Sequence, residues 1–390
     1  MSSTAAGSRS RYRWAILAGG VVAQASFSAV LLGLPAIAPA VRHGYGLTLP
    51  QLGVVLAAPN FGLVVTLLPW GLVADRIGER AVVGIALGGT AVAVAAAGRT
   101  SSYVSLVVAL SVAGALGGGV QSASGRAVMS WFGPEERGLA LGIRQTAVPV
   151  GGAVAAGVLP AIGTLSLTSA FDGLALGCIA GALGGVVLLR REPWQEHDET
   201  AAPLRDAGVW LLCVASTFYV ATQVALVGFL VLFLHDTRGL STGVAAAALA
   251  AIQVFGGIAR VVAGRWSDRL AARIVPLRRV ALLLAASVAA AAALVDAPLW
   301  LLVPALVAAG TLALAWNGLS YTATAEAAGA RRSGAAIGLQ QTFLSVGSIL
   351  APIAFAAIVH QSSWRIGFCL AAASPLAGYA LLSPLAERRS

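Results

Sequence analysis

The chain has 390 residues, of which 58% are hydrophobic and only 10% are charged, and its mean hydropathy is +0.86. Soluble domains are about half apolar and about a quarter charged, so this composition excludes a water-soluble globular protein. The formal net charge of +10 would suggest nucleic-acid binding in a soluble protein. In a membrane protein, however, basic residues have to be assigned loop by loop.

Long apolar stretches follow one another along the chain, each close to the roughly 20 residues that a helix needs to cross a bilayer. They are too long and alternate too little for barrel strands. The first stretch follows three arginines, as in a signal peptide, but it continues past Val30 and is assigned as a span. We predict an all-α integral membrane protein whose twelve helices cover residues 14–40, 49–73, 80–98, 103–130, 138–162, 168–189, 208–234, 243–266, 277–295, 298–325, 334–358 and 364–383.

A charged segment from Arg190 to Asp206 lies near the middle of the chain. It is the one long charged stretch, which is typical of a linker between two bundles. The sequence therefore predicts two six-helix bundles, residues 1–189 and 208–390, joined by a cytoplasmic linker over residues 190–207.

Arginine placement predicts the orientation, because basic residues are retained on the cytoplasmic side. With the N-terminus inside, the inner segments carry 18 of the 25 arginines, and both termini are expected in the cytoplasm. The outer loops carry only Arg42, Arg99, Arg238 and Arg365, and the spans contain Arg126, Arg144 and Arg260. Since every basic residue is arginine, we expect a GC-rich bacterial source and a place in the bacterial cytoplasmic membrane.

An internal repeat relates the two halves, and its offset is close to 195 residues. Trp14 matches Trp210 at an offset of 196. The fifth and eleventh spans match best at the same offset: Gly142, Gln145, Thr146 and Gly151 recur as Gly338, Gln341, Thr342 and Gly347. After the second and eighth spans, Gly71, Asp75 and Arg76 recur as Gly264, Asp268 and Arg269 at an offset of 193.

At these residues the chain resembles the major facilitator superfamily (MFS) over essentially its whole length. The loop signature G-x-x-x-D-R-x-G-x-R is present as Gly71, Asp75, Arg76, Gly78 and Arg80, and the second copy has Ala271 in place of the later glycine. The resemblance implies a secondary transporter whose two bundles rock about a site near the bilayer midplane and open it alternately to each side. In that family the loop latches the gate.

The loop residues also have physical roles that do not depend on the family. Gly71 would allow two helices to approach closely, and Gly78 suits a tight turn. Asp75 and Arg76 offer a negative charge to a helix N-terminus and a positive charge to a carboxylate, which would close the cytoplasmic face. The competing interpretation is ordinary positive-inside decoration.

Arg260 is the sharpest substrate candidate, because it lies eight residues before Asp268 and so about 12 Å inside the eighth span. An arginine here resembles the pattern of monocarboxylate, oxalate and nitrate porters in the superfamily, where it meets the anion. A guanidinium can fork onto a planar oxyanion through two charge-assisted hydrogen bonds. The alternative is a structural arginine paired with a carbonyl or a carboxylate.

Other polar residues lie in the spans that line the cavity in this family, namely the first, fourth, seventh and tenth. We predict substrate contacts for Gln24, Gln121, Tyr219, Gln223, Asn317 and Tyr321, with Ser28 and Ser122 beside them. We place Arg126, Arg144, Gln145 and Gln341 in the vestibule or gate. For any one of them, hydrogen bonding between helices is an alternative role.

None of the 15 acidic residues falls at mid-span by these boundaries. Cation–proton antiport usually places a carboxylate there, so its absence beside three intramembrane arginines favours an anion as substrate. The alternative function is export of drug-like apolar compounds by proton antiport. It rests on Pro149, Gly151 and Gly152, which resemble the proline–glycine motif of such exporters, although Val148 stands where a glycine is expected.

Neither a catalytic cluster nor a phosphate loop is visible, so we do not expect an enzyme, and we expect no cofactor or metal. The three cysteines lie in apolar runs without metal-ligand spacing, and we expect them to be small buried hydrophobes. The expected partners are the lipid bilayer and a small substrate with a coupled proton, without nucleic acid and without a second subunit.

Overall fold

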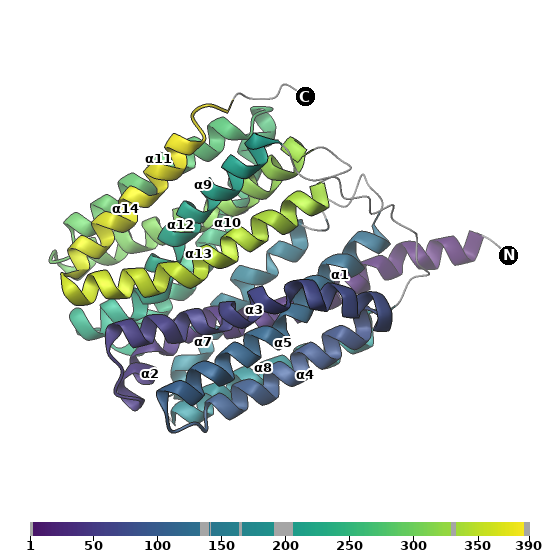
Figure 1. Ribbon diagram of the computed structural model, residues 1–390, viewed down its shortest axis with the longest axis horizontal. Helices are drawn as coiled ribbons and strands as arrows, with labels where there is room; N and C mark the ends of the chain where they lie inside the picture. Colours follow the sequence, from purple (N-terminus) through teal and green to yellow (C-terminus); the bar gives the residue numbers. More distant parts are fainter. Residues whose placement is uncertain are drawn as a thin grey trace. The chain divides into compact units, whose positions relative to one another are not determined.

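A computed structural model describes residues 3–132, 140, 142–163, 166–190, 206–328 and 333–385, and these residues contain no strand. In the first half the helices are α1 (Ser3–Gly33), α2 (Ala38–Gly44), α3 (Leu49–Ile77), α4 (Glu79–Ala97), α5 (Tyr103–Trp131), α7 (Ala147–Gly163) and α8 (Leu167–Leu188) (Figure 1). In the second half they are α9 (Ala207–Leu232), α10 (Thr242–Arg269), α11 (Ile274–Ala293), α12 (Leu299–Ala328), α13 (Ser333–Gln361) and α14 (Trp364–Leu381). Two short turns, η1 (Leu34–Ile37) and η2 (Phe233–Thr237), extend α1 and α9.

The predicted all-helical membrane architecture is confirmed. Within the described ranges, 11 helical segments are long and apolar enough to cross a membrane. The twelfth predicted span forms the helix α14, which has 18 residues but is not among those 11 segments. It includes Arg365 in its first turn and packs along α9 and α11.

The first span is not one continuous helix to residue 40 as predicted. Helix α1 ends at Gly33, and α2 begins at Ala38 after the turn η1. Pro35 and Pro39 explain the break, since proline donates no backbone hydrogen bond and disfavours helical geometry in the residue before it. Ends elsewhere shift by a few residues, with α3 continuing to Ile77.

The helices form two compact units. Unit 1 comprises residues 1–34 and 58–198, and unit 2 comprises residues 35–57 and 199–390. Within unit 1, α4 lies beside α5 and α8, and α1 packs on α7 and α8; within unit 2, α10 packs on α12, α11 on α14, and α9 on α13 (Figure 1). Most of the predicted linker lies outside the described residues, so the boundary between the halves stays a prediction.

Repeat-related glycines make the same kind of close helix contact in each unit. A Cβ added to Gly151 of α7 would clash with the Ala25 carbonyl of α1. In unit 2, a Cβ at Gly347 of α13 would lie 2.7 Å from Val220 of α9. Small residues at such crossings allow helices to associate in lipid, where apolar burial gives little driving force.

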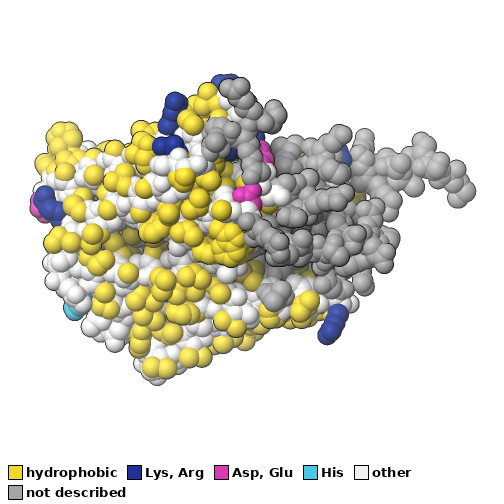
Figure 2. Space-filling view, turned by 45° about the horizontal axis from the view of Figure 1, so that its top comes forward, with side chains coloured by type: hydrophobic (Ala, Val, Ile, Leu, Met, Phe, Trp, Pro, Cys, Tyr) yellow, Lys and Arg dark blue, Asp and Glu magenta, His cyan; other side chains and the backbone are white. Residues whose placement is uncertain are grey.

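Large hydrophobic side chains cover much of the outer surface, as expected of helices solvated by lipid. Figure 2 shows them spread over the visible face, with charged groups mostly at its edges. Val65, Val92 and Trp300 are 74%, 72% and 73% exposed. Cys178 and Cys213 are buried as predicted, whereas Cys369 on α14 is exposed, so its predicted burial is wrong. The face that Cys369 occupies also carries Leu370, which points to lipid rather than core.

The four arginines of the predicted outer loops are each held by a carboxylate or a carbonyl. The distances are 2.5–2.6 Å, and the partners are Asp236 for Arg42, Asp172 for Arg99, the Ala297 carbonyl for Arg238 and Asp296 for Arg365. The hydrogen bond and charge of Asp172 raise the pKa of the Arg99 guanidinium. Exposed pairs of this kind contribute about 0–1 kcal/mol each, so they position loops more than they stabilise the fold.

The turn after α3 has the geometry predicted from its glycine. Gly78 has φ +85°, a conformation that side chains disfavour, and it directly precedes α4. The second copy of the loop has Ala271 at the equivalent place, and Ala271 keeps φ +45°. A positive φ is therefore retained at this position of the repeat even where the glycine is not.

Ala271→Gly is expected to stabilise the protein. A non-glycine residue in the left-handed region costs about 1–2 kcal/mol, while glycine loses about 0.5–1 kcal/mol through its freer unfolded chain, so the net gain is about 0.5–1 kcal/mol. Gly78→Ala should lose about 1 kcal/mol. The measurement is the Tm of detergent-purified protein, with Gly88→Ala in mid-α4 as a control that meets no atom within 4 Å. A lower Tm for Ala271→Gly would contradict the strain.

Candidate functional site

Arg144 is the centre of a buried polar network in unit 1. The residue is only 7% exposed. The Nη2 group donates to the Gln24 side-chain oxygen of α1 at 3.0 Å and to the Gln121 backbone carbonyl of α5 at 3.2 Å. The Nε group donates to the Ser124 hydroxyl at 3.1 Å. Gln24 also donates to Ser28, at 3.4 Å.

The packing of α5 makes room for this guanidinium. Gly125 has no side chain, and a Cβ there would lie 3.7 Å from the Arg144 Cζ. Burying a guanidinium is costly unless its donors are hydrogen-bonded, and the acceptors on α1 and α5 meet that requirement. We placed Arg144 in the vestibule, and the structure brings it together with two predicted substrate residues, Gln24 and Gln121.

Arg126, which we grouped with Arg144, lies in a different environment. Its Nε donates to the Glu79 carboxylate at 3.1 Å, and both side chains are partly buried. Glu79 is the first residue of α4, so the pair ties the start of α4 to α5.

Gln145 is half-buried, and Ser122 donates to the Leu67 carbonyl of α3 at 3.2 Å.

Unit 2 has its own half-buried polar cluster on α9, α12 and α13. The Asn317 amide donates to the Gln223 side-chain oxygen at 3.0 Å, and the Tyr321 hydroxyl donates to Gln341 at 2.5 Å. Three of these four were predicted as substrate residues, and Gln341 was placed at the gate. Neutral amides and a phenol therefore link α12 to α9 and to α13.

Arg260 reaches the same part of unit 2 from α10. Its Nε donates to the Leu314 carbonyl of α12 at 3.4 Å, and its stem lies over Gly318, where a Cβ would be 3.4 Å from the Arg260 Cγ. The residue is half-buried. Arg260 therefore has a carbonyl partner, one of the two structural partners considered above.

Sequence reasoning missed a second, fully buried layer in unit 2. The Gln340 amide donates to Ser320 at 2.5 Å and to Ser216 at 3.1 Å, and all three residues are completely buried. Gln340 and Ser320 are the repeat partners of Arg144 and Ser124 at an offset of 196, so the same contact recurs with glutamine in place of arginine. The repeat offset was the signal that could have identified these residues.

Tyr219 belongs to the apolar core of unit 2. It is 1% exposed, its ring is 5.5 Å from that of Trp316, and it packs on Gly378 of α14. Sequence reasoning also missed Gln253 of α10, which is 1% exposed and has no hydrogen-bond partner on either amide atom in the described structure.

The second copy of the loop motif is fastened by a charge network within unit 2. Arg273 donates to Asp268 at 2.6 Å and is 3.0 Å from Glu326 at the end of α12. Burial alone would lower the pKa of Arg273, but its bonds to Glu326 and Asp268 raise it. The neighbouring Arg269 is exposed.

The first copy is only partly described, because the Asp75 side chain lies outside the described residues. Arg76 and Arg80 are exposed. A Cβ at Gly71 or at Gly264 would meet no atom within 4 Å, so neither glycine is needed for close packing within its own unit. The close helix approach expected at Gly71 stays a prediction.

The described helices carry acidic residues only in their first or last two turns. Of the described residues, no three histidine, cysteine or acidic side chains form a possible metal site. What the spans do offer is a guanidinium in each unit, surrounded by neutral amides, hydroxyls and carbonyls. Such groups can bind an anion through charge-assisted hydrogen bonds.

Comparisons with known proteins agree with this architecture. The model of the Major Facilitator Superfamily matches residues 16–352. The MFS-type transporter Rv2994 of Mycobacterium tuberculosis is 32% identical over 376 residues, covering 95% of this chain and 84% of the relative. A probable sulfoacetate transporter, SauU of Cupriavidus necator, is 24% identical over 86% of this chain and 85% of its own length.

Solved structures show the same fold. A bacterial homologue of the human lysosomal transporter Spinster, in an inward-facing, unoccupied conformation, matches with a TM-score of 0.74 and 17% identity over 95% of both chains. A variant of the nucleoside transporter NupG matches with a TM-score of 0.76 and 12% identity, over 96% of this chain and 99% of that one.

Proposed function

Because the chain belongs to the Major Facilitator Superfamily, we propose that it moves a small organic or inorganic anion across the bacterial cytoplasmic membrane by alternating access. The chain is a multi-pass membrane transporter. The anion as cargo, the coupling to a proton gradient, the single-subunit state and the cytoplasmic position of both termini are parts of this proposal.

The observation that carries the proposal is the charge balance of the spans. Arg260 lies well inside the apolar helix α10, and Arg144, near the start of its span, is buried against α1 and α5, whereas the described helices hold acidic residues only near their ends. An ionisable group within a membrane is costly and therefore points to a functional pathway. A pathway lined by cationic groups favours entry of an anion and disfavours a cation.

The neutral groups beside Arg260 suit a role in orienting an anion. Gln223 and Asn317 hold each other at 3.0 Å, and Tyr321 is fixed by Gln341, so their geometry is set before a ligand arrives. Amides and hydroxyls can donate to an oxyanion without adding charge. The likeness to SauU, a probable sulfoacetate transporter, supports the same substrate class, because sulfoacetate is an organic anion.

The proposal predicts selective uptake of anions by the purified protein. Proteoliposomes should accumulate at least one member of a labelled panel of carboxylates, sulfonates, oxalate and nitrate. A pH difference across the membrane should change the rate of uptake if transport is coupled to a proton. Protein-free liposomes and liposomes with a labelled cationic panel are the controls. Uptake of cations in preference to every anion would contradict the charge argument, because intramembrane arginines repel them.

Export of apolar, drug-like compounds remains the second candidate. Pro149 and Gly151 lie in α7, and Gly151 allows its close packing on Ala25 of α1. The export hypothesis requires that α1 and α7 can slide against each other at this contact. Proton-driven efflux of an uncharged dye from the same proteoliposomes, with no anion transported, would favour it over the anion proposal.

A further inference from the structure

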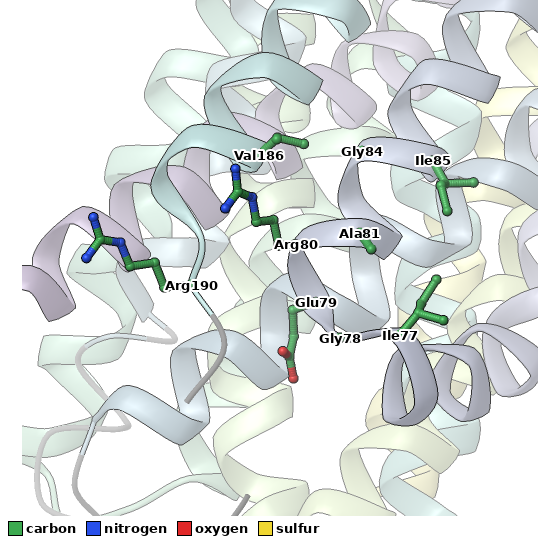
Figure 3. Close-up of a pocket in the computed structure, with 9 residues that line it drawn as sticks. All are labelled: Ile77, Gly78, Glu79, Arg80, Ala81, Gly84, Ile85, Val186 and Arg190. Carbon is green, nitrogen blue, oxygen red and sulfur yellow. The ribbon is translucent and has the colours of Figure 1, made fainter. Parts of the chain in front are cut away.

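Unit 1 contains a cavity of about 760 Å³ where α3 turns into α4 and α8 ends (Figure 3). Its wall is formed by Ile77, the first turns of α4 and the last residues of α8. This is the end of the helices that we predict to lie at the cytoplasmic leaflet. None of the predicted substrate residues lines it.

Two arginines, Arg80 and Arg190, line this cavity. Arg80 is exposed and makes no hydrogen bond or ion pair within the described structure. Figure 3 shows its guanidinium directed toward Val186, while the Glu79 carboxylate points the other way, to where Arg126 binds it. The charge of Arg80 is therefore not neutralised by its acidic neighbour.

Within the part of the chain that the structure describes, Arg190 is held by an aromatic ring and has no carboxylate partner. Its guanidinium lies 4.3 Å from the ring centroid of Tyr12, and the Tyr12 hydroxyl donates to the Leu188 carbonyl at 2.9 Å. A cation–π contact orients a guanidinium but leaves its N–H donors available. The cavity thus has one fixed and one extended guanidinium.

The equivalent loop of unit 2 is built differently. Arg273, the repeat partner of Arg80 at an offset of 193, is bound by the carboxylates of Asp268 and Glu326. In unit 1 the position that corresponds to Glu326 is Ser130, at an offset of 196. Two carboxylates therefore hold the arginine in unit 2, whereas Arg80 lines a cavity in unit 1, where the side chain of Asp75, the counterpart of Asp268, lies outside the described residues.

Glu79 also lines the cavity, but its carboxylate is paired with Arg126, and the rest of the wall is glycine or apolar. Ile77 and Ile85 are 44% and 52% exposed, and Val186 is a further apolar residue of the wall. A ligand that fits must carry negative charge at one end and hydrocarbon at the other. Inorganic phosphate or a soluble carboxylate would leave the isoleucines uncovered.

We propose that this cavity binds an anionic phospholipid, with its phosphate between Arg80 and Arg190 and an acyl chain along Ile77 and Ile85. Basic pockets between spans at the cytoplasmic side recognise acidic headgroups, and guanidinium binds phosphate through paired N–H donors. The site is separate from the proposed substrate cluster, so it does not depend on the transported cargo.

The test measures lipid binding rather than transport. Delipidated full-length protein in detergent is titrated with dioleoylphosphatidylglycerol and followed by native mass spectrometry. The double variant Arg80→Gln/Arg190→Gln should bind the tightest lipid about thirtyfold more weakly, at roughly 1 kcal/mol per arginine near a headgroup. The single variant Arg265→Gln, at an exposed arginine of α10 that does not line the cavity, should bind like the parent.

Two further arms decide between sources of the negative charge. Dioleoylphosphatidylcholine should bind the parent no better than it binds the double variant, and glycerol phosphate should not displace phosphatidylglycerol. Equal phosphatidylglycerol binding by the parent and the double variant would overturn the site. Displacement by millimolar glycerol phosphate would overturn the role of the acyl chain. Circular dichroism of the double variant checks that it remains folded.

Discussion

Arg260→Gln is expected to abolish binding of the transported anion while leaving the protein folded and inserted. Charged hydrogen bonds contribute about 1.5–3 kcal/mol each, so losing both bonds of the fork should weaken binding by more than about a hundredfold. The fold should tolerate the change because Arg260 is half-buried and its stem lies over the open backbone of Gly318. Glutamine still has a donor for the Leu314 carbonyl.

Arg260→Lys separates charge from geometry. An ammonium keeps the positive charge but cannot present two parallel donors to a planar oxyanion, so most transport should be lost although the protein stays inserted. The measurement is equilibrium binding of the anion identified in the uptake panel, with Arg99→Gln, an exposed and paired arginine, as the matched control. If Arg260→Gln binds that anion as tightly as the parent, the arginine is structural and the export hypothesis becomes the better one.

The reciprocal substitutions Arg144→Gln and Gln340→Arg, at a repeat-related pair of positions, are expected to impair different properties. The first should mainly reduce transport, and the second should mainly reduce stability. Arg144→Gln installs the residue that unit 2 already uses, and its amide can still bond to Ser124, as Gln340 does to Ser320. The bonds to Gln24 and to the Gln121 carbonyl are lost, at about 1 kcal/mol each, while a buried charge is removed, so stability should fall by about 1–2 kcal/mol. Anion transport should fall much further because the unit loses its intramembrane charge.

Gln340→Arg should be far more damaging to the fold. The side chain is fully buried against Ser216 and Ser320, and a larger charged group there would be uncompensated, which costs about 3–5 kcal/mol. Fluorescence-detected size-exclusion chromatography after heating ranks the two variants, with Gln341→Arg at the neighbouring half-buried position as the control. If Gln340→Arg melted at the same temperature as the parent, Gln340 would not be fully buried as described.

The helical architecture followed from hydropathy because lipid leaves the backbone few alternatives. The break after Gly33 could also have been anticipated from Pro35 and Pro39. The end of α3 was placed four residues too early because Asp75 and Arg76 were counted as loop, although charges are tolerated in a last helical turn at the interface.

Burial of polar residues could not be predicted from the sequence. In a soluble protein the polar face of a helix marks solvent, but a transmembrane helix is apolar on its lipid side and on its packed side. Gln340, which is fully buried, and Gln341, which is half-buried, are adjacent in sequence, and only the structure separates them. Tyr219 was misleading for the same reason, since its ring serves the core of unit 2.

The distribution of cysteines and amines makes this chain a convenient background for site-specific labelling. Cys178 and Cys213 are 0% exposed, and Cys369 opens onto a face shared with Leu370 and Ile366, where water-soluble maleimides have little access inside a bilayer. A single cysteine introduced at an exposed loop position would therefore carry a fluorophore or spin label with little background. The 390 residues contain no lysine, so an amine-reactive dye has no lysine side chain to modify there.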